Sequence, residues 1–303
     1  MSVVKLTPMR WFVILLLIAT VLALALPPDP ATLKLYHIST TTYRVIIALL
    51  LIPEALLWYA CFFAYSKLLE YSRYLGGSKE HRAFKKITLG MGVLAYGLIL
   101  PTIVSLLLSI LSHHSESFKP SATIITNYIS LLVVLISFSV LRGGTQILIE
   151  SSRSIKRPSL RGLRMFALLF TVLAVFFTYA TIHTHHLSNN AYRLSLVPLM
   201  LTIIIPYLYA WFEGLVCVYN FRLYSIYVKG VLYKKAFFGL SVGLLLTVIA
   251  SIAMEFITST IGARKDEPLG FVVLVLYIII AIFLAGLGMM ALGTKKLKKI
   301  EEV

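Results

Sequence analysis

Residues 45–65 read VIIALLLIPEALLWYACFFAY and carry one charged side chain, Glu54. A membrane-spanning α-helix needs about 20 consecutive apolar residues to cross a hydrocarbon core about 30 Å thick, and this run is that long. Backbone polar groups cannot stay unpaired in lipid, and the alternating pattern of a membrane β-barrel is absent, so we expect the run to be helical. The stretch therefore predicts a helix that crosses a membrane.

The composition of the whole chain agrees with this interpretation. Of the 303 residues, 59% are hydrophobic and 13% are charged, whereas a soluble domain carries roughly 25% charged residues. The mean hydropathy is +0.90. These values exclude a soluble globular protein, a disordered chain and a disulfide scaffold. The two cysteines, Cys61 and Cys217, lie in apolar runs without a CxxC pair, so we interpret them as buried hydrophobic side chains.

Eight apolar runs are long enough to be membrane spans. The predicted spans are residues 11–26, 45–65, 87–111, 122–141, 165–182, 194–219, 236–261 and 269–292. The first run has a second interpretation, because Lys5, Arg10 and the small residues near Ala25 also resemble a cleavable signal peptide. Cleavage would leave seven spans, whereas the duplication described below favours eight.

The basic residues predict the orientation of these spans. The chain has 28 Lys and Arg against 12 Asp and Glu, a formal charge of +16. With the N-terminus in the cytoplasm, the outer segments hold six of the basic residues and the inner segments hold the other 22. The outer six are Lys34, Arg44, Lys119, Arg193, Arg264 and Lys265. The positive-inside rule therefore predicts a plasma-membrane protein whose N- and C-termini both lie in the cytoplasm. Its basic loops would lie against the anionic lipid headgroups of the cytoplasmic leaflet. The charge sits in short loops, so we do not predict nucleic-acid binding.

An internal duplication divides the chain into two halves. Ile52-Pro53, four residues and Trp58 recur 153 residues later as Ile205-Pro206, four residues and Trp211. Further matches need small gaps, including Phe84-Lys85-Lys86 with Tyr233-Lys234-Lys235 and Gly90 with Gly239. We infer two membrane units of four spans each, residues 1–158 and 159–303. An even number of spans makes the units parallel, related by a pseudo-twofold axis along the membrane normal.

Acidic residues inside the spans are candidate functional residues, because insertion of each costs about 2.5–3.5 kcal/mol. They are Glu54, Glu213 and Glu255. Glu54 follows Pro53, which is expected to kink its helix, and its repeat counterpart is Tyr207. Glu54 is expected either to line a polar cavity or to be a protonated core carboxyl. Arg142 can form an ion pair with Glu213 or extend to the membrane surface. The candidate pathway residues are Pro53, Glu54, Trp58, Pro206, Trp211 and Glu213.

Histidines gather in the predicted outer segments. His113, His114, His183 and His186 are candidate ligands for a metal or haem, although solvated loop positions are the simpler interpretation. Catalytic signatures such as HExxH, GxSxG and the P-loop are absent from the sequence. We therefore predict no catalytic residue and leave the cofactor unassigned.

Three functions remain open from the sequence. The leading hypothesis is a solute or ion permease or channel with its pathway at the interface of the two repeats. The second is a non-transporting membrane subunit or sensor that docks a partner on the cytoplasmic ends of spans two and six. The tyrosines there are Tyr65, Tyr71, Tyr74, Tyr219, Tyr224 and Tyr227. The partner would be another protein or a second copy of this chain. The third is a redox protein that binds metal or haem at the outer histidines.

Overall fold

The computed structural model describes residues 7–25, 39–76, 79–112, 119–152, 190–261 and 269–301. Within these residues the chain forms seven α-helices and no strands. They are α1 (Pro8–Ala25), α3 (Thr40–Tyr74), α4 (Lys79–Ser112), α5 (Lys119–Ser151), α7 (Asn190–Tyr227), α8 (Val231–Ile261) and α9 (Leu269–Glu301). The predicted all-α fold is confirmed for this part of the chain.

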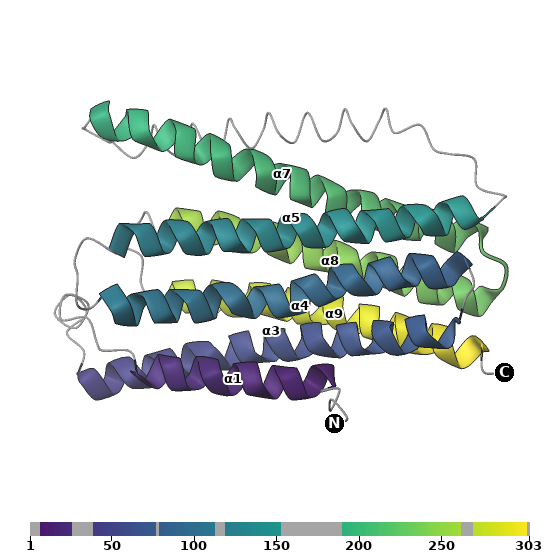
Figure 1. Ribbon diagram of the computed structural model, residues 1–303, viewed down its shortest axis with the longest axis horizontal. Helices are drawn as coiled ribbons and strands as arrows, with labels where there is room; N and C mark the ends of the chain where they lie inside the picture. The colour runs from purple at the N-terminus through teal and green to yellow at the C-terminus, as the bar shows by residue number, and fades with distance from the viewer. Residues whose placement is uncertain are drawn as a thin grey trace, which may run out of the picture.

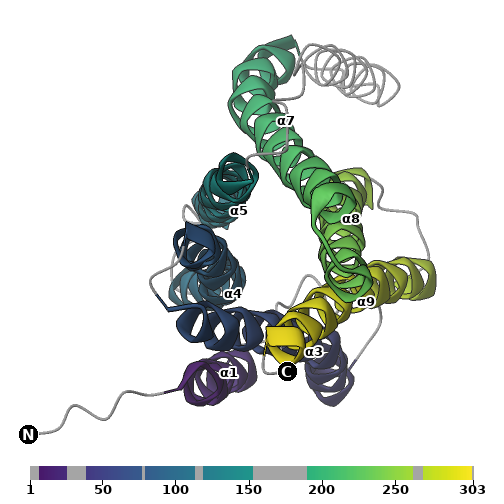
Figure 2. The same ribbon diagram turned by 90° about the vertical axis from the view of Figure 1, so that its right-hand side faces the viewer.

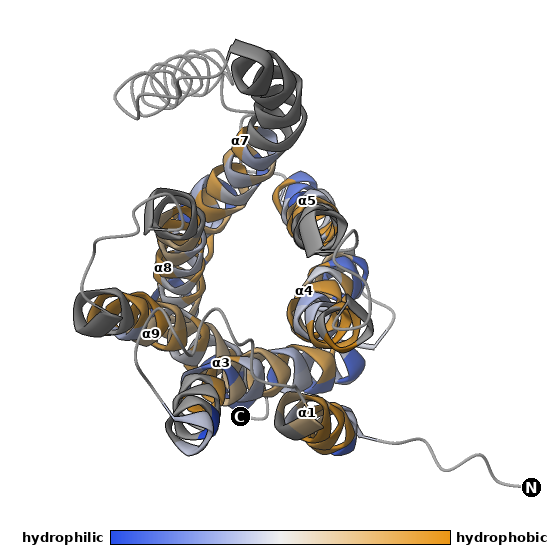
Figure 3. Cartoon of the chain, turned by 90° about the vertical axis from the view of Figure 1, so that its left-hand side faces the viewer, coloured by the Kyte–Doolittle hydropathy of each residue, from blue (hydrophilic) through white to orange (hydrophobic). Residues whose placement is uncertain are grey.

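Four of the described helices are long and apolar enough to cross a membrane. The qualifying segments are Glu80–Leu108, Ile129–Ser151, Val231–Met254 and Leu274–Ile300, and Pro8–Ala23 is a shorter apolar helix. Apolar stretches run along α1, α8 and α9 in particular (Figure 3). These helices indicate a membrane protein. The predicted fifth span, residues 165–182, lies outside the described residues.

The helices extend further than the hydropathy of the sequence predicts. α5 continues through Gly143 and Gly144 to Ser151, and α7 contains 38 residues. At 1.5 Å per residue α7 is about 57 Å long, well beyond a hydrocarbon core of about 30 Å. Hydropathy marks only the part of a helix that matches the lipid, whereas backbone hydrogen bonding continues through the charged residues that follow.

Glycines with positive φ follow the ends of α3 and α7. Gly76 has φ of 47° and Gly230 has φ of 99°, a region that is costly for residues with a Cβ atom. Each helix end is closed by a similar backbone bond. Leu75 N donates to Tyr71 O over 3.1 Å, and Val228 N donates to Tyr224 O over 2.9 Å. These turns send α4 and α8 back antiparallel to the preceding helices.

Six of the helices form a closed ring. The helices lie side by side along the long axis of the molecule (Figure 1). Seen end-on, α3, α4, α5, α7, α8 and α9 follow one another around the ring, and α9 contacts α3 to close it (Figure 2). α1 packs outside the ring against α3 and α4.

Glycines allow the closest helix pairs to touch through their backbones. A Cβ atom on Gly90 of α4 would lie 2.9 Å from the carbonyl oxygen of Ser137 on α5. In α8 and α9, a Cβ on Gly243 would lie 2.6 Å from Gly286 O, and one on Gly286 would lie 2.7 Å from Gly243 O. Small residues are a common means of close helix packing in membranes, where apolar burial alone gives little preference for one partner.

One end of the bundle, the basic end, contains the α3–α4 turn, the α7–α8 turn and the C-terminal end of α9 (Figure 1). Lysines and arginines of these segments include Arg73, Lys79, Arg82, Lys85, Lys86, Lys229, Lys234, Lys235, Lys295, Lys296, Lys298 and Lys299. Helix starts at the opposite end carry Arg44, Lys119 and Arg193.

Candidate functional site

Glu54 lies on the buried face of α3. It directly follows Pro53, and α3 remains helical through both residues. Leu57, Trp58 and Cys61 are buried at three, four and seven residues beyond it, so the same face of the helix points into the protein. Glu54 Oε2 is buried and has no hydrogen-bond partner among the described residues. A carboxyl oxygen in this position must find a proton, a cation or water to offset its desolvation.

Glu213 on α7 meets Arg142 on α5. The Glu213 side chain is 1% exposed, and Arg142 Nη1 donates a hydrogen bond to its Oε1 atom. Tyr209, one turn earlier on α7, also interacts with this carboxylate. Glu213 Oε2 has no hydrogen-bond partner in the described part of the chain. From the sequence, Arg142 could either pair with Glu213 or extend to the membrane surface. The structure places Arg142 and Glu213 in an ion pair.

Further polar contacts join α5 to α7 beside this ion pair. Asn220 Nδ2 donates to Thr145 Oγ1 over 3.1 Å, and Thr145 Oγ1 donates to Arg142 O over 3.0 Å. Sequence reasoning missed Thr145 and Asn220. Their spacing was an available signal, because Thr145 is three residues after Arg142 and Asn220 is seven after Glu213, which places each on the same helix face as the charge.

The α3–α9 contact carries a different ion pair at the basic end. Glu70 of α3 accepts hydrogen bonds from Lys298 of α9 and from Lys67 of α3, the latter over 3.1 Å. Glu70 is exposed, with 44% of its side-chain area accessible. The hydrogen bonds from Lys298 and Lys67 lower the pKa of Glu70 below its ordinary value of 4.5.

This ion pair predicts a small dependence of stability on pH. Because the folded-state pKa of Glu70 is lowered, the pair stabilises the protein above about pH 4.5 and loses this contribution as the pH falls further. The contribution is about 0.5 kcal/mol or less, since the pair is exposed to solvent. Unfolding of the parent and of Glu70→Gln by denaturant in one detergent, over a pH series, measures it. We expect the difference in the free energy of unfolding between the parent and Glu70→Gln to shrink as the pH is lowered. A difference that grows in acid contradicts the prediction, and Lys298→Gln should behave as Glu70→Gln does.

An aromatic cluster joins α3, α4, α7 and α8 near the basic end. The Tyr71 ring packs on Phe84 with centroids 4.7 Å apart, and the Tyr224 ring packs on Phe237 with centroids 4.6 Å apart. The ring centroids of Phe84 and Phe237 are 6.2 Å apart. Tyr71 is therefore a core residue. Of the tyrosines considered for docking a partner, Tyr74, Tyr219 and Tyr227 are exposed.

The other residues singled out from the sequence are distributed as follows. Trp58 is buried, and the half-buried Trp211 donates from Nε1 to Ser251 Oγ over 3.3 Å. Pro206 lies within α7, but its side chain and that of Glu255 are outside the described residues, as are His113, His114, His183 and His186. Among the described side chains, no group of three His, Cys, Asp or Glu is placed to hold a metal ion.

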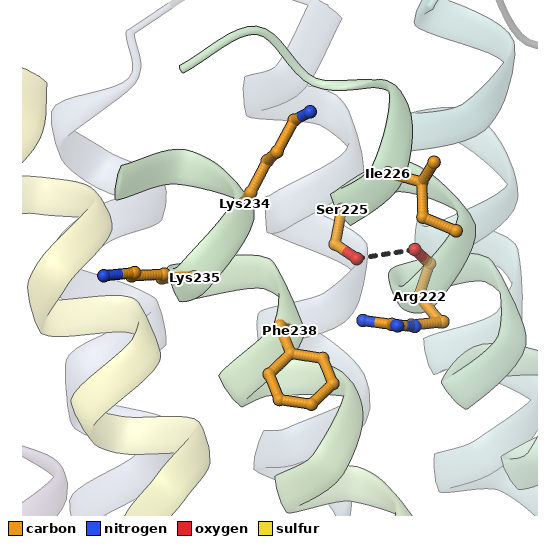
Figure 4. A pocket seen from close by; sticks show the side chains of 6 residues that line it. All are labelled: Arg222, Ser225, Ile226, Lys234, Lys235 and Phe238. Carbon is orange, nitrogen blue, oxygen red and sulfur yellow. Dashed lines mark hydrogen bonds between the residues drawn. The ribbon is translucent and has the colours of Figure 1, made fainter. Parts of the chain in front are cut away.

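Sequence reasoning also missed a pocket of about 330 Å³ between the basic ends of α7 and α8 (Figure 4). Its lining residues are Arg222, Ser225, Ile226, Lys234, Lys235 and Phe238. The Arg222 guanidinium lies 4.6 Å from the centroid of the Phe238 ring, and Ser225 Oγ donates to Arg222 O over 2.6 Å.

No family model matches this sequence, and no curated protein or solved structure is significantly similar to it. The function is therefore argued from the residues of this chain.

Proposed function

We propose that this protein is a solute or ion permease or channel. Its pathway lies inside the six-helix ring, between two parallel four-helix repeats that comprise residues 1–158 and 159–303. The observation that carries the proposal is the buried Glu54 Oε2 on the inward face of a membrane helix, where no described residue gives it a hydrogen bond. Intramembrane carboxyls that face the protein interior commonly mark ion or proton pathways.

The contacts between helices support the duplication. α3 contacts α4 as α7 contacts α8, and α4 contacts α5 as α8 contacts α9. The two remaining contacts of the ring, α5 with α7 and α9 with α3, join one half to the other. This arrangement is what a pseudo-twofold axis along the ring axis requires, since each of the six contacts around the ring has an equivalent in the other half.

Contacts between side chains support the same relation. The Tyr71–Phe84 pair recurs 153 residues later as Tyr224–Phe237. With this constant offset of 153 residues, Phe84 corresponds to Phe237 without a gap. We therefore align Phe84 with Phe237 and not, through a gap, with Tyr233. The contact of Phe84 with Phe237 then joins a residue to its own counterpart, which occurs only next to a twofold axis.

The same alignment supports a pathway that is closed towards the basic end. Phe84 and Phe237 are both buried, and they meet between the two halves. Aromatic rings in contact across a pathway exclude water and ions there. Glu54 lies 17 residues before Tyr71 on α3, about 25 Å along the helix, and therefore well beyond this closure.

We further propose eight spans, with the basic end and both termini in the cytoplasm. The N-terminal end of α1 points towards the same end of the bundle as the C-terminal end of α9 (Figure 1). The lysines and arginines of the basic end then follow the positive-inside rule. On this assignment the basic loops lie against the anionic headgroups of the inner leaflet of the plasma membrane.

Thiol accessibility at position 54 tests the pathway. In a background with Cys61→Ala and Cys217→Ala, we expect Glu54→Cys to react with membrane-impermeant thiol reagents, because thiolates form in water and hardly at all in lipid. Leu56→Cys is the matched control. Leu56 is two residues away, on the opposite side of α3, and is 50% exposed. We expect labelling at position 54 to be at least several-fold faster than at position 56.

Flux in proteoliposomes supplies the second readout. We expect Glu54→Gln to lower the flux of protons or small cations, and Glu70→Gln, an exposed change at the basic end of the same helix, to leave the flux unchanged. The permease proposal is wrong if Glu54→Cys folds but is not labelled from either side and Glu54→Gln has no effect on flux. The alternative, a non-transporting membrane subunit, would then be the better proposal.

A further inference from the structure

The pocket between α7 and α8 concentrates positive charge. Arg222 comes from α7, and Lys234 and Lys235 come from the first two turns of α8. All three side chains are exposed, and none of the described residues that line the pocket is acidic. Three cations around one pocket repel one another, and a bound anion would offset this repulsion. The chemistry of the lining therefore fits a phosphate group, towards which the exposed lysine side chains would turn from the separate directions that Figure 4 shows.

The walls of the pocket are apolar. Phe238 is 44% exposed and Ile226 is 53% exposed, and Leu232 nearby on α8 is 62% exposed. The face of Phe238 also orients the Arg222 guanidinium through a cation–π contact. A free inorganic anion would leave these apolar surfaces uncovered, whereas an amphiphile would cover them while its headgroup meets the cations.

The position along the helices fits the same kind of ligand. The apolar segment of α8 runs from Val231 to Met254, so the lysines stand at its first turns, where a span enters the membrane surface. Basic pockets between membrane helices at this depth are a recurring way of binding the headgroups of anionic lipids.

We propose that this pocket binds the phosphate of an anionic phospholipid, with Arg222, Lys234 and Lys235 as its ligands and Phe238 and Ile226 against the upper acyl chain. This site is independent of any transport activity. The equivalent place between α3 and α4 differs from this pocket. There, His81 Nδ1 donates a hydrogen bond to Ser72 O over 2.6 Å, so a side chain bridges the two helices.

Binding of phosphatidylglycerol to the purified protein in detergent tests the site, with native mass spectrometry to count bound lipid. Each removed cation should weaken binding about fivefold, so Lys234→Gln with Lys235→Gln should weaken it about 25-fold, and adding Arg222→Gln about a hundredfold. Lys295→Gln with Lys296→Gln is the matched control, because both lysines are exposed at the basic end and neither lines the pocket. The control should retain the parental affinity.

The comparison of ligands identifies the source of the phosphate. We expect phosphatidylglycerol to bind and phosphatidylcholine to bind much more weakly, with inorganic phosphate unable to displace the lipid at equal concentration. Displacement by inorganic phosphate overturns the lipid assignment in favour of a free anion. Equal binding of phosphatidylcholine, or equal loss of affinity in the control variant, overturns the site. The paired lysine variant carries the test even if Arg222→Gln does not fold, since both lysines are exposed.

Discussion

Arg142→Leu is expected to destabilise the protein by about 3–5 kcal/mol, because it leaves the Glu213 carboxylate buried without its partner. Glu213 is 1% exposed, so its carboxylate depends on this partner for most of the stabilisation that water would otherwise give it. The loss should appear as a lower midpoint of denaturant unfolding in a fixed detergent. Lys298→Leu is the control that breaks an exposed ion pair, and we expect it to cost at most about 1 kcal/mol.

A double variant separates the ion pair from packing at the same place. Arg142→Leu combined with Glu213→Leu removes both charges, so most of the stability lost in the single variant should return. If the double variant is as unstable as Arg142→Leu alone, the cost comes from the shape of the α5–α7 contact rather than from the unpaired carboxylate. The polar contact of Asn220 with Thr145 remains in both variants and keeps the two helices in register.

Gly286→Ala and Gly288→Ala are expected to have opposite effects on stability, although they add the same methyl group to the same helix. At Gly286 the new Cβ would lie 2.7 Å from Gly243 O, a backbone atom that cannot move unless α8 and α9 separate. We expect this overpacking to cost about 1–3 kcal/mol. At Gly288 the new Cβ would meet no other packed atom of the described residues within 4 Å, so the gain in helix propensity of up to about 1 kcal/mol should remain.

Thermal unfolding of both variants in one detergent measures this difference. The apparent melting temperature should fall for Gly286→Ala and stay level or rise for Gly288→Ala. Equal melting temperatures would show that α8 and α9 can separate at the glycine contact without loss, and that the close approach of Gly243 and Gly286 is not required for stability.

The sequence alone was sufficient to predict local features of this protein. Long apolar runs predicted helices, because in lipid only a helix pairs the backbone groups of a single segment. All predicted spans that fall within the described residues lie in α-helices. Hydropathy could not predict how far the helices extend beyond the membrane, because that depends on backbone hydrogen bonds.

The faces of each helix could not be predicted from hydropathy. Leu56 and Tyr59 on α3 are exposed, whereas Leu57 and Trp58 are buried, although all four belong to one apolar run. In a soluble protein polar residues mark the outer face, but in a membrane lipid is as apolar as the protein interior. The tyrosines show the same difficulty, since Tyr71 is a core residue and Tyr74 is exposed.

The sites were decided by tertiary structure. The contact of Arg142 with Glu213 spans 71 residues, and that of Glu70 with Lys298 spans 228 residues. The sequence showed that Glu54, Arg142 and Glu213 are costly in a membrane, and so made them candidates. Whether each charge finds a partner depends on which helices are neighbours in the ring. The sequence thus determined the helices and their charged residues. The arrangement of helices in the ring determined that Glu213 is paired and that one oxygen of Glu54 has no partner among the described residues, because pairing needs two helix faces within a few ångströms of each other.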